Sequence, residues 1–382
     1  MKHGFKIFDS DLHVMEPPDL WPTYIDSEFK HLAPVGTENA VRDLGLIEPD
    51  GAQWLNRRSA LSGSPRQLGT GKTWLRDQVR YKSHHERHWT AAVQLEAMDE
   101  EGIDVATLYP TRGLHTLARY DMHPAFAAAL ARAYNNWMYD FCAFNPTRLF
   151  GVAMISPFDI DAAVQETRRA LKELGFKGIF LRANIVNRRN WHDPYYDPLW
   201  STLEELDATV GFHESAGSAV RQTGDQFSEF LLRHTYSHPV EQMMVLGPFC
   251  AGGVLEKHPH LRVAFLEGNA SWLPWLLWRL DEHWELFGDT DAPDTKMKPS
   301  AYFKRQCFVS VDCEESPVKY AIDYIGNDNM IFSTDFPHVD AQFPHSSDHF
   351  FALPLSDEDK RKILWDNCAR FYGMAVPVAP MA

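Results

Sequence analysis

The chain has 382 residues, a formal net charge of −15 and 23% charged residues, and this acidic balance argues against nucleic acid or an anionic membrane surface as its main partner. Its hydrophobic content of 45% is typical of a soluble globular protein. The five cysteines form no CxxC pair, the N-terminal stretch MKHGFKIFDSD carries charges where a signal peptide would need its apolar core, and no apolar run approaches the length of a membrane helix. We therefore expect a soluble, cytoplasmic protein whose partner is a small-molecule substrate.

Short apolar runs alternate with helix-like stretches along most of the chain. The first run is FKIFDSDLH at 5–13, and the later ones cover 105–111, 150–157, 176–184, 210–215, 262–268, 307–313 and 330–338. Runs of Val, Ile and Phe are typical of strands buried on both faces, and strand–helix alternation implies parallel pairing. These eight strands predict an α/β fold of the (β/α)8 TIM barrel type. An open dinucleotide-binding sheet is less favoured, because no GxGxxG motif follows a strand.

Residues 17–90 do not fit this repeat, because they are rich in Pro, Gly, Arg and Trp. We expect them to form an insertion after the first strand that covers the barrel mouth as a lid. The whole chain, 1–382, is then a single domain.

Metal-binding residue types end several of the predicted strands. The first strand places Asp11 and His13 two positions apart, so that both side chains point to one face. His213 ends the fifth strand, Glu267 the sixth and Asp335 the eighth. Barrel chemistry is built at the C-terminal ends of strands, and imidazole and carboxylate groups bind divalent cations. The pattern therefore predicts a metal site at the barrel mouth.

Each of these residues alone has an ordinary structural explanation. Asp11 and His13 could form a turn or a helix cap. His213 could be a core histidine, and Asp335 could cap the turn before a proline. Glu267 is harder to explain in this way, because a carboxylate in a buried strand is unfavourable unless it is paired or bound to metal. It is their joint placement that favours the metal site.

Three further residues near the strand ends, His234, His238 and Arg182, have alternative explanations. His234 and His238 are spaced to share a helix face, but Pro239 indicates that a helix begins there. We therefore expect only His238 to face the site and to act as a metal ligand. Arg182, at the end of the fourth strand, either binds a substrate carboxylate or pairs with an acid such as Glu214.

Two more residues lie close to the predicted ligands. Asp9 is on the same alternation as Asp11 but deeper in the strand, so we expect it to support the site. His338 lies just beyond the eighth strand. We expect it to hold the anionic part of the substrate together with Arg182.

Several longer sequence motifs are more specific than the spacing of single residues. They are DxDxH in the first strand, GIDVATLYPT, FKGIFLRAN, DPYYDPLWSTLEELDATVGFHES, GGVLEKHPHLRVAFLEGNASWLPWLLWRLDEH and IGNDNMIFSTDFPHVD. With them the chain resembles the amidohydrolase superfamily, in the amidohydrolase-2 branch of aminocarboxymuconate-semialdehyde decarboxylase and related aromatic-acid decarboxylases and hydrolases. The resemblance implies a distorted barrel, a divalent metal such as zinc or manganese, and a homodimer. It assigns Asp11, His13 and His213 as ligands and Asp335 as ligand and proton acceptor.

Glu267 departs from this pattern, because the decarboxylases carry a histidine at the end of the sixth strand, thought to act in proton transfer. A glutamate beside a metal is an anion and a ligand, and it can bridge two ions. The resemblance to a glutamate-bearing subgroup linked to diiron oxygenation adds weight to this alternative. The full set that could hold two ions is Asp11, His13, His213, His238, Glu267 and Asp335.

The leading hypothesis is a metal-dependent hydrolase or carboxy-lyase acting on a small, aromatic or cyclic organic acid. A metal-bound water or substrate oxygen would react, with Asp335 and Glu267 as the catalytic residues. The alternative is a non-haem diiron monooxygenase in which Glu267 is a second-metal or bridging ligand. A third, non-enzymatic hypothesis is a binding protein with a vestigial site.

Overall fold

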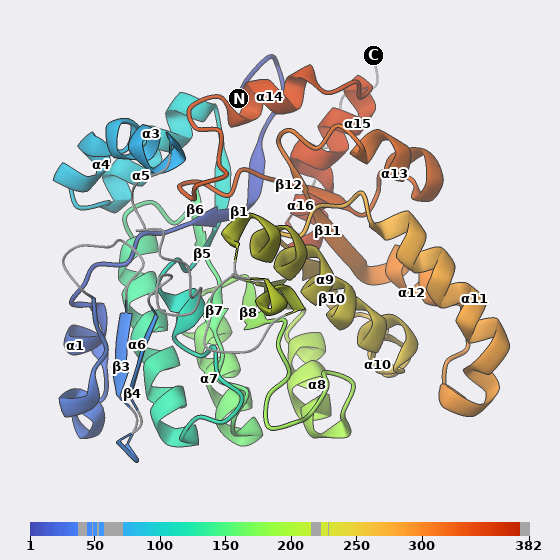
Figure 1. Ribbon diagram of the computed structural model, residues 1–382, viewed down its shortest axis with the longest axis horizontal. Helices are drawn as coiled ribbons and strands as arrows, with labels where there is room; N and C mark the ends of the chain where they lie inside the picture. Colours follow the sequence, from blue (N-terminus) through green and yellow to red (C-terminus); the bar gives the residue numbers. More distant parts are fainter. Residues whose placement is uncertain are drawn as a thin grey trace.

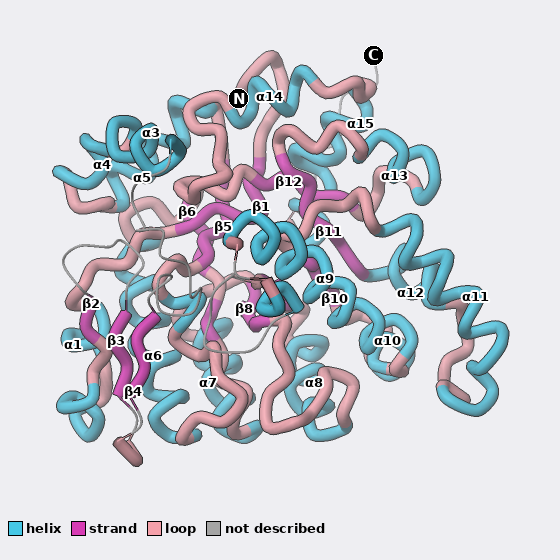
Figure 2. The backbone as a smooth tube through the Cα atoms, viewed as in Figure 1, coloured by secondary structure: helices cyan, strands magenta, loops and turns pink. Residues whose placement is uncertain are grey.

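The computed structural model shows parallel strands at the centre and helices around them (Figures 1 and 2). The structure describes residues 1–36, 44–47, 49–51, 53–56, 72–214, 223–227 and 229–374. The parallel strands are β1 (Phe8–His13), β5 (Val105–Tyr109), β6 (Leu149–Gly151), β7 (Ala153–Met154), β8 (Gly178–Arg182), β9 (Thr209–His213), β10 (Arg262–Phe265), β11 (Cys307–Asp312) and β12 (Met330–Ser333).

These strands form two sheets, in the orders β1-β5-β6 and β12-β11-β10-β9-β8-β7. Only Val152 separates β6 from β7, so the two short strands share one barrel position. At the other pair of sheet edges, the backbone N–H of Asp335 donates to the carbonyl of Asp11 (3.2 Å), and that of His13 donates to Phe336 (2.8 Å). The eight strand positions therefore follow one another in the order predicted for a (β/α)8 barrel.

Most of the helices that follow the strands lie outside the sheets, whereas α9 (Phe230–Ala251) lies across the ends of β9 and β10 (Figure 1). The helices after the strands are α5 (Ala91–Glu101), α6 (Pro124–Cys142), α7 (Ile160–Lys172), α8 (Asp197–Glu205), α9, α10 (Val254–Lys257), α11 (Leu273–Asp291), α12 (Pro299–Gln306), α13 (Val318–Ile325), α14 (Ser346–Ala352), α15 (Asp357–Arg361), the π-helix η5 (Lys362–Asp366) and α16 (Asn367–Phe371), with short 3-10 turns η2 (Gly113–His115), η3 (Pro194–Tyr196) and η4 (Thr223–Gln226). No helix of the described ranges is long and apolar enough to cross a membrane.

The helix α7 shows how the sequence builds these outer elements. Its Ala163 and Ala170 are buried together with Glu166, whose carboxylate accepts a hydrogen bond from the buried Asn135, and most of its other charged residues occupy the opposite face. At its start, the Asp159 carboxylate accepts the backbone N–H of Ala162 (2.9 Å). This cap satisfies one of the free N–H groups of the first turn and explains why the helix begins there.

The segment between β1 and α5 contains α1 (Leu20–Tyr24), the 3-10 helix η1 (Ser27–Leu32), the antiparallel strands β2 (Val35–Gly36), β3 (Leu44–Ile47) and β4 (Gln53–Asn56), and the helices α3 (Lys72–Arg80) and α4 (Lys82–Glu86). α1 lies against α6, whereas α3 reaches the loop after β12 (Figure 1). There Arg76 donates to the carbonyl of Val339 (2.8 Å) and Arg80 to that of Ala341 (3.0 Å). Much of 37–71 lies outside the described residues, so the lid role of 17–90 stays a prediction.

The carboxylate of Glu16, shortly after β1, fixes the loop that follows β5. It accepts the backbone N–H groups of Thr111, Arg112 and Gly113 at 2.8 to 3.2 Å. Burial raises the pKa of Glu16, and these backbone donors oppose the rise. A side chain at Gly113 would not fit, because its Cβ would lie 2.7 Å from Cβ of Pro110. Glu16 therefore holds one wall of the barrel mouth in place.

Replacing Glu16 by alanine should lower the free energy of unfolding by roughly 3 kcal/mol, because several buried N–H groups would lose their acceptor. Glu16→Gln keeps one acceptor oxygen and should lose less than half as much. Urea denaturation of the two variants and the wild type measures the difference. Equal loss in both variants would show that the acceptor oxygens do not stabilise the loop.

Candidate metal centre

The strand β1 points its charged side chains into the barrel. Asp9, Asp11 and His13 are all 0% exposed. Nδ1 of His13 lies 2.7 Å from the carbonyl oxygen of Pro110, which can only accept a hydrogen bond. Nδ1 therefore carries the proton in the neutral ring, and Nε2 keeps its lone pair available for a cation.

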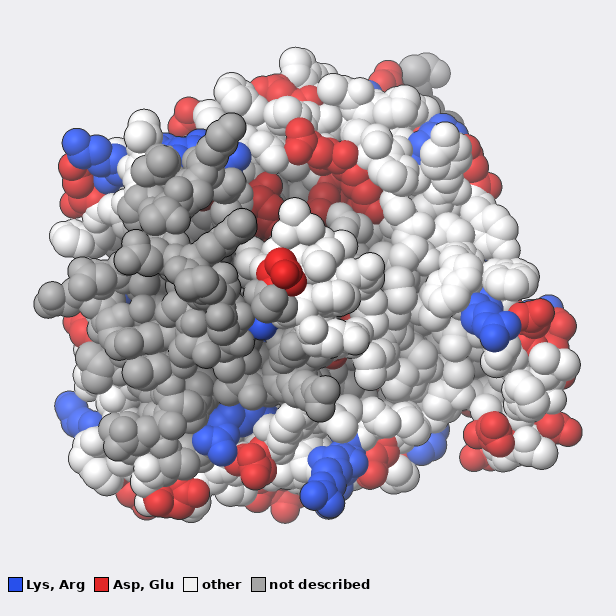
Figure 3. Space-filling view, in the orientation of Figure 1, with Lys and Arg blue, Asp and Glu red and all other residues white. Residues whose placement is uncertain are grey.

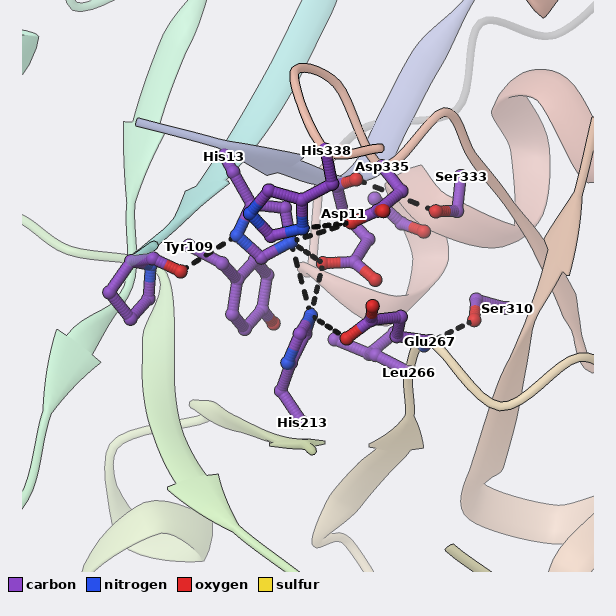
Figure 4. A network of polar contacts seen from close by, with 12 residues as sticks. Asp11, His13, Tyr109, His213, Leu266, Glu267, Ser310, Ser333, Asp335 and His338 are labelled. Carbon is purple, nitrogen blue, oxygen red and sulfur yellow. Dashed lines mark hydrogen bonds and ion pairs between the residues drawn. The ribbon is translucent and has the colours of Figure 1, made fainter. Parts of the chain in front are cut away.

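The ends of β9 and β12 complete a compact cluster with β1 (Figure 4). Nε2 of His213 lies 3.1 Å from Nε2 of His13 and 3.3 Å from Oδ1 of Asp11. Oδ1 of Asp335 lies 3.1 Å from Nε2 of His13. We call these four residues, Asp11, His13, His213 and Asp335, the ligand cluster.

The carboxylate of Glu267, after β10, reaches the edge of the ligand cluster. Its Oε2 lies 3.4 Å from Nε2 of His213 and 3.1 Å from Nδ1 of His238. Glu267 and Asp335 have backbone φ angles of 51° and 54°, in the left-handed region that residues other than glycine rarely adopt. The backbone N–H of Glu267 donates to Oγ of Ser310 (3.0 Å), which helps to hold this conformation. Such strain persists where the surrounding structure enforces it, often at functional sites.

Burial and neighbouring charges shift the pKa values in this region. Burial disfavours ionised Asp11, but the charge of His213 and the contact with His13 outweigh burial and lower its pKa. Burial lowers the pKa of His213. Burial also raises the pKa of Glu267 well above its usual range, and the charge of Asp335 adds to the rise. The neighbouring groups thus supply too little positive charge for all of the buried carboxylates. A divalent cation would supply the rest.

The donor set fits such a cation. Both carboxylate oxygens of Asp11 and of Asp335, and Oε2 of Glu267, are buried and have no N–H or O–H group aligned for a hydrogen bond, although imidazole nitrogens lie close to several of them. The ligand atoms of Asp11, His13 and His213 lie within 4.8 Å of one another, as do those of His213, Glu267 and Asp335. Mixed imidazole and carboxylate ligation suits zinc and manganese. A cation would give these buried oxygens the partner that they otherwise lack.

Asp9 lies beneath the ligand cluster and joins β1 to the end of β12. Its carboxylate accepts the backbone N–H of Asp11 (3.1 Å) and both the N–H (3.3 Å) and the hydroxyl of Thr334. Burial raises the pKa of Asp9 to about 7, although these hydrogen bonds oppose the rise. These contacts agree with the expectation that Asp9 supports the site.

Of the two explanations for Arg182, the structure shows the ion pair with Glu214. Its Nε donates to Oδ1 of Asn184 (3.1 Å), and another guanidinium N–H donates to the carbonyl of Leu114. The guanidinium therefore braces the end of β8 against the neighbouring loops. Direct binding of a substrate carboxylate by Arg182 stays a prediction.

The ring of His338 lies between the ligand cluster and the loop after β5. Nδ1 is 2.8 Å from Oδ1 of Asp335, and Nε2 is 3.0 Å from Oγ1 of Thr111. The ring centroid is 4.0 Å from that of His13. These contacts suit a residue that orients Asp335, and a contact between His338 and substrate stays a prediction.

The expectation that a helix begins at Pro239 is wrong. α9 runs from Phe230 to Ala251 with Pro239 inside it. The helix buries one face against the ends of β9 and β10, and this apolar burial outweighs the hydrogen bond that proline cannot make. As a result His234 and His238 both lie beside Glu267, rather than His238 alone, and their ring centroids are 4.4 Å apart.

Sequence patterns did not single out Gln242, which lies four residues after His238 on the same helix. Its side chain is fully buried, and its Nε2 donates to the carbonyls of Phe212 (3.0 Å) and Leu266 (2.7 Å). These carbonyls directly precede His213 and Glu267. The amide therefore holds two ligand-bearing strand ends at a fixed separation. The i, i+4 spacing from His238 was the available signal.

The variant Gln242→Leu should weaken Mn²⁺ binding by about 10-fold or more, because residues that position metal ligands typically have effects of this size. Isothermal titration of Mn²⁺ into chelator-treated protein measures the change.

The chain offers a matched control in Gln306. Its buried amide makes the same kind of double contact, with the carbonyls of His258 and Leu261 (both 2.7 Å), at the opposite end of β10. Gln306→Leu should lower thermal stability to a similar degree and leave Mn²⁺ affinity unchanged. Equal affinity losses in both variants would mean that Gln242 acts through stability alone.

A family model described as Amidohydrolase matches residues 9–374. The chain therefore belongs to the amidohydrolase family. It is 25% identical over 293 residues to the 2-amino-3-carboxymuconate-6-semialdehyde decarboxylase of Dictyostelium discoideum (75% of this chain, 77% of the relative). It is 28% identical over 294 residues to a gamma-resorcylate decarboxylase of Rhodococcus jostii (73% and 86%).

The fold is also found in a solved structure of 5-carboxyvanillate decarboxylase from Novosphingobium aromaticivorans. The TM-score is 0.70 at 19% identity, over 98% of this chain and 97% of the other, and that structure is a complex with manganese and 4-hydroxy-3-methoxy-5-nitrobenzoic acid. The predictions of an amidohydrolase-type α/β fold and of a metal-dependent enzyme of this family are confirmed. The comparisons give no support to the diiron monooxygenase alternative.

Proposed function

We propose that this amidohydrolase-family chain is a metal-dependent carboxy-lyase that removes a carboxylate from a small aromatic or cyclic organic acid. The observation that carries the proposal is the ligand cluster, whose buried carboxylate oxygens lie close to imidazole nitrogens that are not aligned for hydrogen bonds. The relatives that are named as decarboxylases of carboxymuconate semialdehyde and of gamma-resorcylate favour loss of CO2 over hydrolysis.

The ligand cluster divides into holding and proton-handling groups. Asp11, His13 and His213 would hold a divalent cation, which acts when bound as a Lewis acid on a substrate oxygen. Loss of CO2 leaves an electron pair on a carbon atom, and that carbon must gain a proton. We assign this proton delivery to Asp335, and the position of its Oδ1, 3.1 Å from Nε2 of His13 and 2.8 Å from Nδ1 of His338, supports the assignment.

The surrounding residues fix this geometry. His338 orients the Asp335 carboxylate and is itself held by Thr111. Glu267 is the second acid–base candidate, because burial and the charge of Asp335 raise its pKa well above the usual range of a glutamate. Arg182 contributes by holding Glu214 at the rim of the site.

The variant His213→Ala should lose bound Mn²⁺ and at least 100-fold in decarboxylation rate. Asp335→Asn should lower kcat by about 10²- to 10⁴-fold, the usual contribution of a positioned proton donor. The assay follows CO2 release from 2,6-dihydroxybenzoate and 5-carboxyvanillate after reloading chelator-treated protein with Mn²⁺. His283→Ala, on the outer helix α11, serves as the control and should retain full metal content and rate.

Undiminished decarboxylation by metal-free His213→Ala would refute the proposed role of the ligand cluster. If the reloaded wild type hydrolyses aryl esters or lactones and releases no CO2, the carboxy-lyase proposal is replaced by hydrolysis.

We also propose that the chain forms a homodimer through the helical face of α11 and α13, at the right edge of Figure 1. Large apolar side chains are exposed there, among them Trp275 (58%), Trp278 (50%) and Tyr324 (59%). Large exposed aromatic side chains are enriched at protein interfaces. A second copy of this chain is the occupant that the family resemblance implies.

Substitution Trp278→Glu should shift the protein from dimer to monomer, because it places a charge in the apolar contact. Light scattering after size-exclusion chromatography reads the mass of wild type and variant. Tyr139→Glu, at an exposed aromatic position on α6, is the control and should remain dimeric. A monomeric wild type at micromolar concentration would refute the homodimer.

A cytoplasmic location is likewise our proposal. All five cysteines are free and buried in the structure. Reduced thiols are typical of proteins kept in a reducing compartment, whereas secreted proteins usually pair them.

A further inference from the structure

The loop that carries Glu267 is tied to the neighbouring strand by one buried carboxylate. Oε1 of Glu315, in the turn after β11, accepts the backbone N–H groups of Ala270 (2.8 Å) and Ser271 (2.7 Å) and the hydroxyl of Ser271. Its Oε2 accepts the backbone N–H of Asp312 (3.3 Å), and the residue is 7% exposed. The carboxylate therefore joins the loop after β10 to the end of β11.

Two more contacts fix the first half of this loop. The hydroxyl oxygen of Ser310 accepts the backbone N–H of Glu267 (Figure 4), and the side-chain amide of Asn269 donates to the carboxylate of Asp312. Ser310 and Asp312 are two positions apart on β11, so their side chains point to the same face. Glu267 and Asn269 have φ angles of 51° and 59°, and such conformations persist where surrounding contacts enforce them. The strand β11 therefore sets the conformation of the loop.

This conformation decides where the Glu267 carboxylate lies. Its Oε2 is 3.4 Å from Nε2 of His213 and 3.1 Å from Nδ1 of His238. Only two residues separate Glu267 from Ala270, whose N–H group is held by Glu315. A shift of the loop at Ala270 would therefore move the carboxylate as well.

A carboxylate at this position also has an ordinary structural role, because the N–H groups that it accepts lie just before α11. Glu101 makes the same contacts at the start of α14, with the N–H groups of Ser346 (2.9 Å) and Ser347 (3.0 Å) and the hydroxyl of Ser347 (2.9 Å). Both carboxylates fix the chain where a helix starts. Of the two, Glu315 alone does so in the loop that carries Glu267.

The two acids of this contact are unfavourably placed for each other. Burial raises the pKa of Asp312 well above its usual range, and the charges of Glu315, Asp340 and Asp335 add to the rise. Burial also raises the pKa of Glu315, although its hydrogen bonds to the loop oppose the rise. Figure 3 shows Asp and Glu side chains gathered above the turns of α9 on this face. An arrangement that lowers stability in this way is expected where a function depends on it.

We propose that Glu315 and Asp312 are positioning residues, which hold the loop after β10 so that the Glu267 carboxylate stays beside His213 and His238. They act through Glu267 and have no contact with substrate in this role. The inference rests on the proposed function, because Glu267 is the second acid–base candidate of that site.

Kinetics at saturating Mn²⁺ test this role. Glu315→Ala should lower kcat by about 10- to 100-fold, the usual effect of removing a group that orients an active-site residue, and should change KM by less than about 2-fold. Glu101→Ala removes the matched helix-start contact and should keep the wild-type kcat with a similar loss of thermal stability. In a Glu267→Gln background, adding Glu315→Ala should lower kcat no further, because both changes affect the same carboxylate.

Asn269→Gly is a milder variant that decides the question if Glu315→Ala does not fold. Glycine adopts the positive φ of this position without strain, so the change breaks the tie to Asp312, and kcat should fall by about 10-fold. Unchanged kcat in Asn269→Gly would overturn the inference. Equal losses of kcat in Glu315→Ala and Glu101→Ala, or independent effects of Glu315→Ala and Glu267→Gln, would overturn it as well.

Crystal structures separate this inference from the proposed function. In Glu315→Ala, or in Asn269→Gly if the former does not fold, the Glu267 carboxylate should move by about 1 Å or more, beyond the ~0.5 Å that an active site tolerates. An unmoved Glu267 overturns the positioning role while the proposed function stands. A wild type that releases no CO2 overturns the proposed function, and the position of Glu267 in the variant then still decides the inference.

Discussion

The need to offset buried negative charge governs the barrel mouth. Asp11, Glu267 and Asp335 converge from three strand ends, and five of their oxygens are buried with no donor group aligned for a hydrogen bond. Leaving ionised carboxylates unpaired in this way is strongly unfavourable, and the nearby imidazoles supply only part of the positive charge. Cation binding and folding of the barrel mouth are therefore coupled, because the same buried carboxylates would destabilise a barrel without metal.

The helix α9 fixes the relative positions of the strand ends that carry these side chains. One buried face of the helix spans the ends of β9 and β10, where Gln242 holds the carbonyls that precede His213 and Glu267. The same face carries His238, whose ring nitrogen contacts the Glu267 carbonyl. The burial that keeps the helix intact through Pro239 also sets the distance between these side chains.

The order of the strands and the core of the site could be predicted from the sequence, since alternation along β1 and the strand-end rule needed no long-range information. Asp11 and His13 share a face by geometry alone, and the topology brings His213 and Asp335 to them. The orientation of His234 could not be predicted. Proline usually stands at the start of a helix, but burial of one face of α9 keeps this helix continuous through Pro239. Gln242 could not be singled out either, since a glutamine on a helix shows its partners only when the sheet is in place.

The position of Glu267 decides how the proton chemistry is divided. A histidine there could carry a proton to the substrate and remain neutral afterwards. Burial raises the pKa of Glu267, so without a bound cation this glutamate can carry a proton, but as a ligand of the cation it would be an anion and a poor proton donor. Proton delivery would then fall to Asp335, whose contact with His338 leads to Thr111 in the loop after β5. Replacing one strand-end residue would thus move acid–base work from the sixth strand to the eighth.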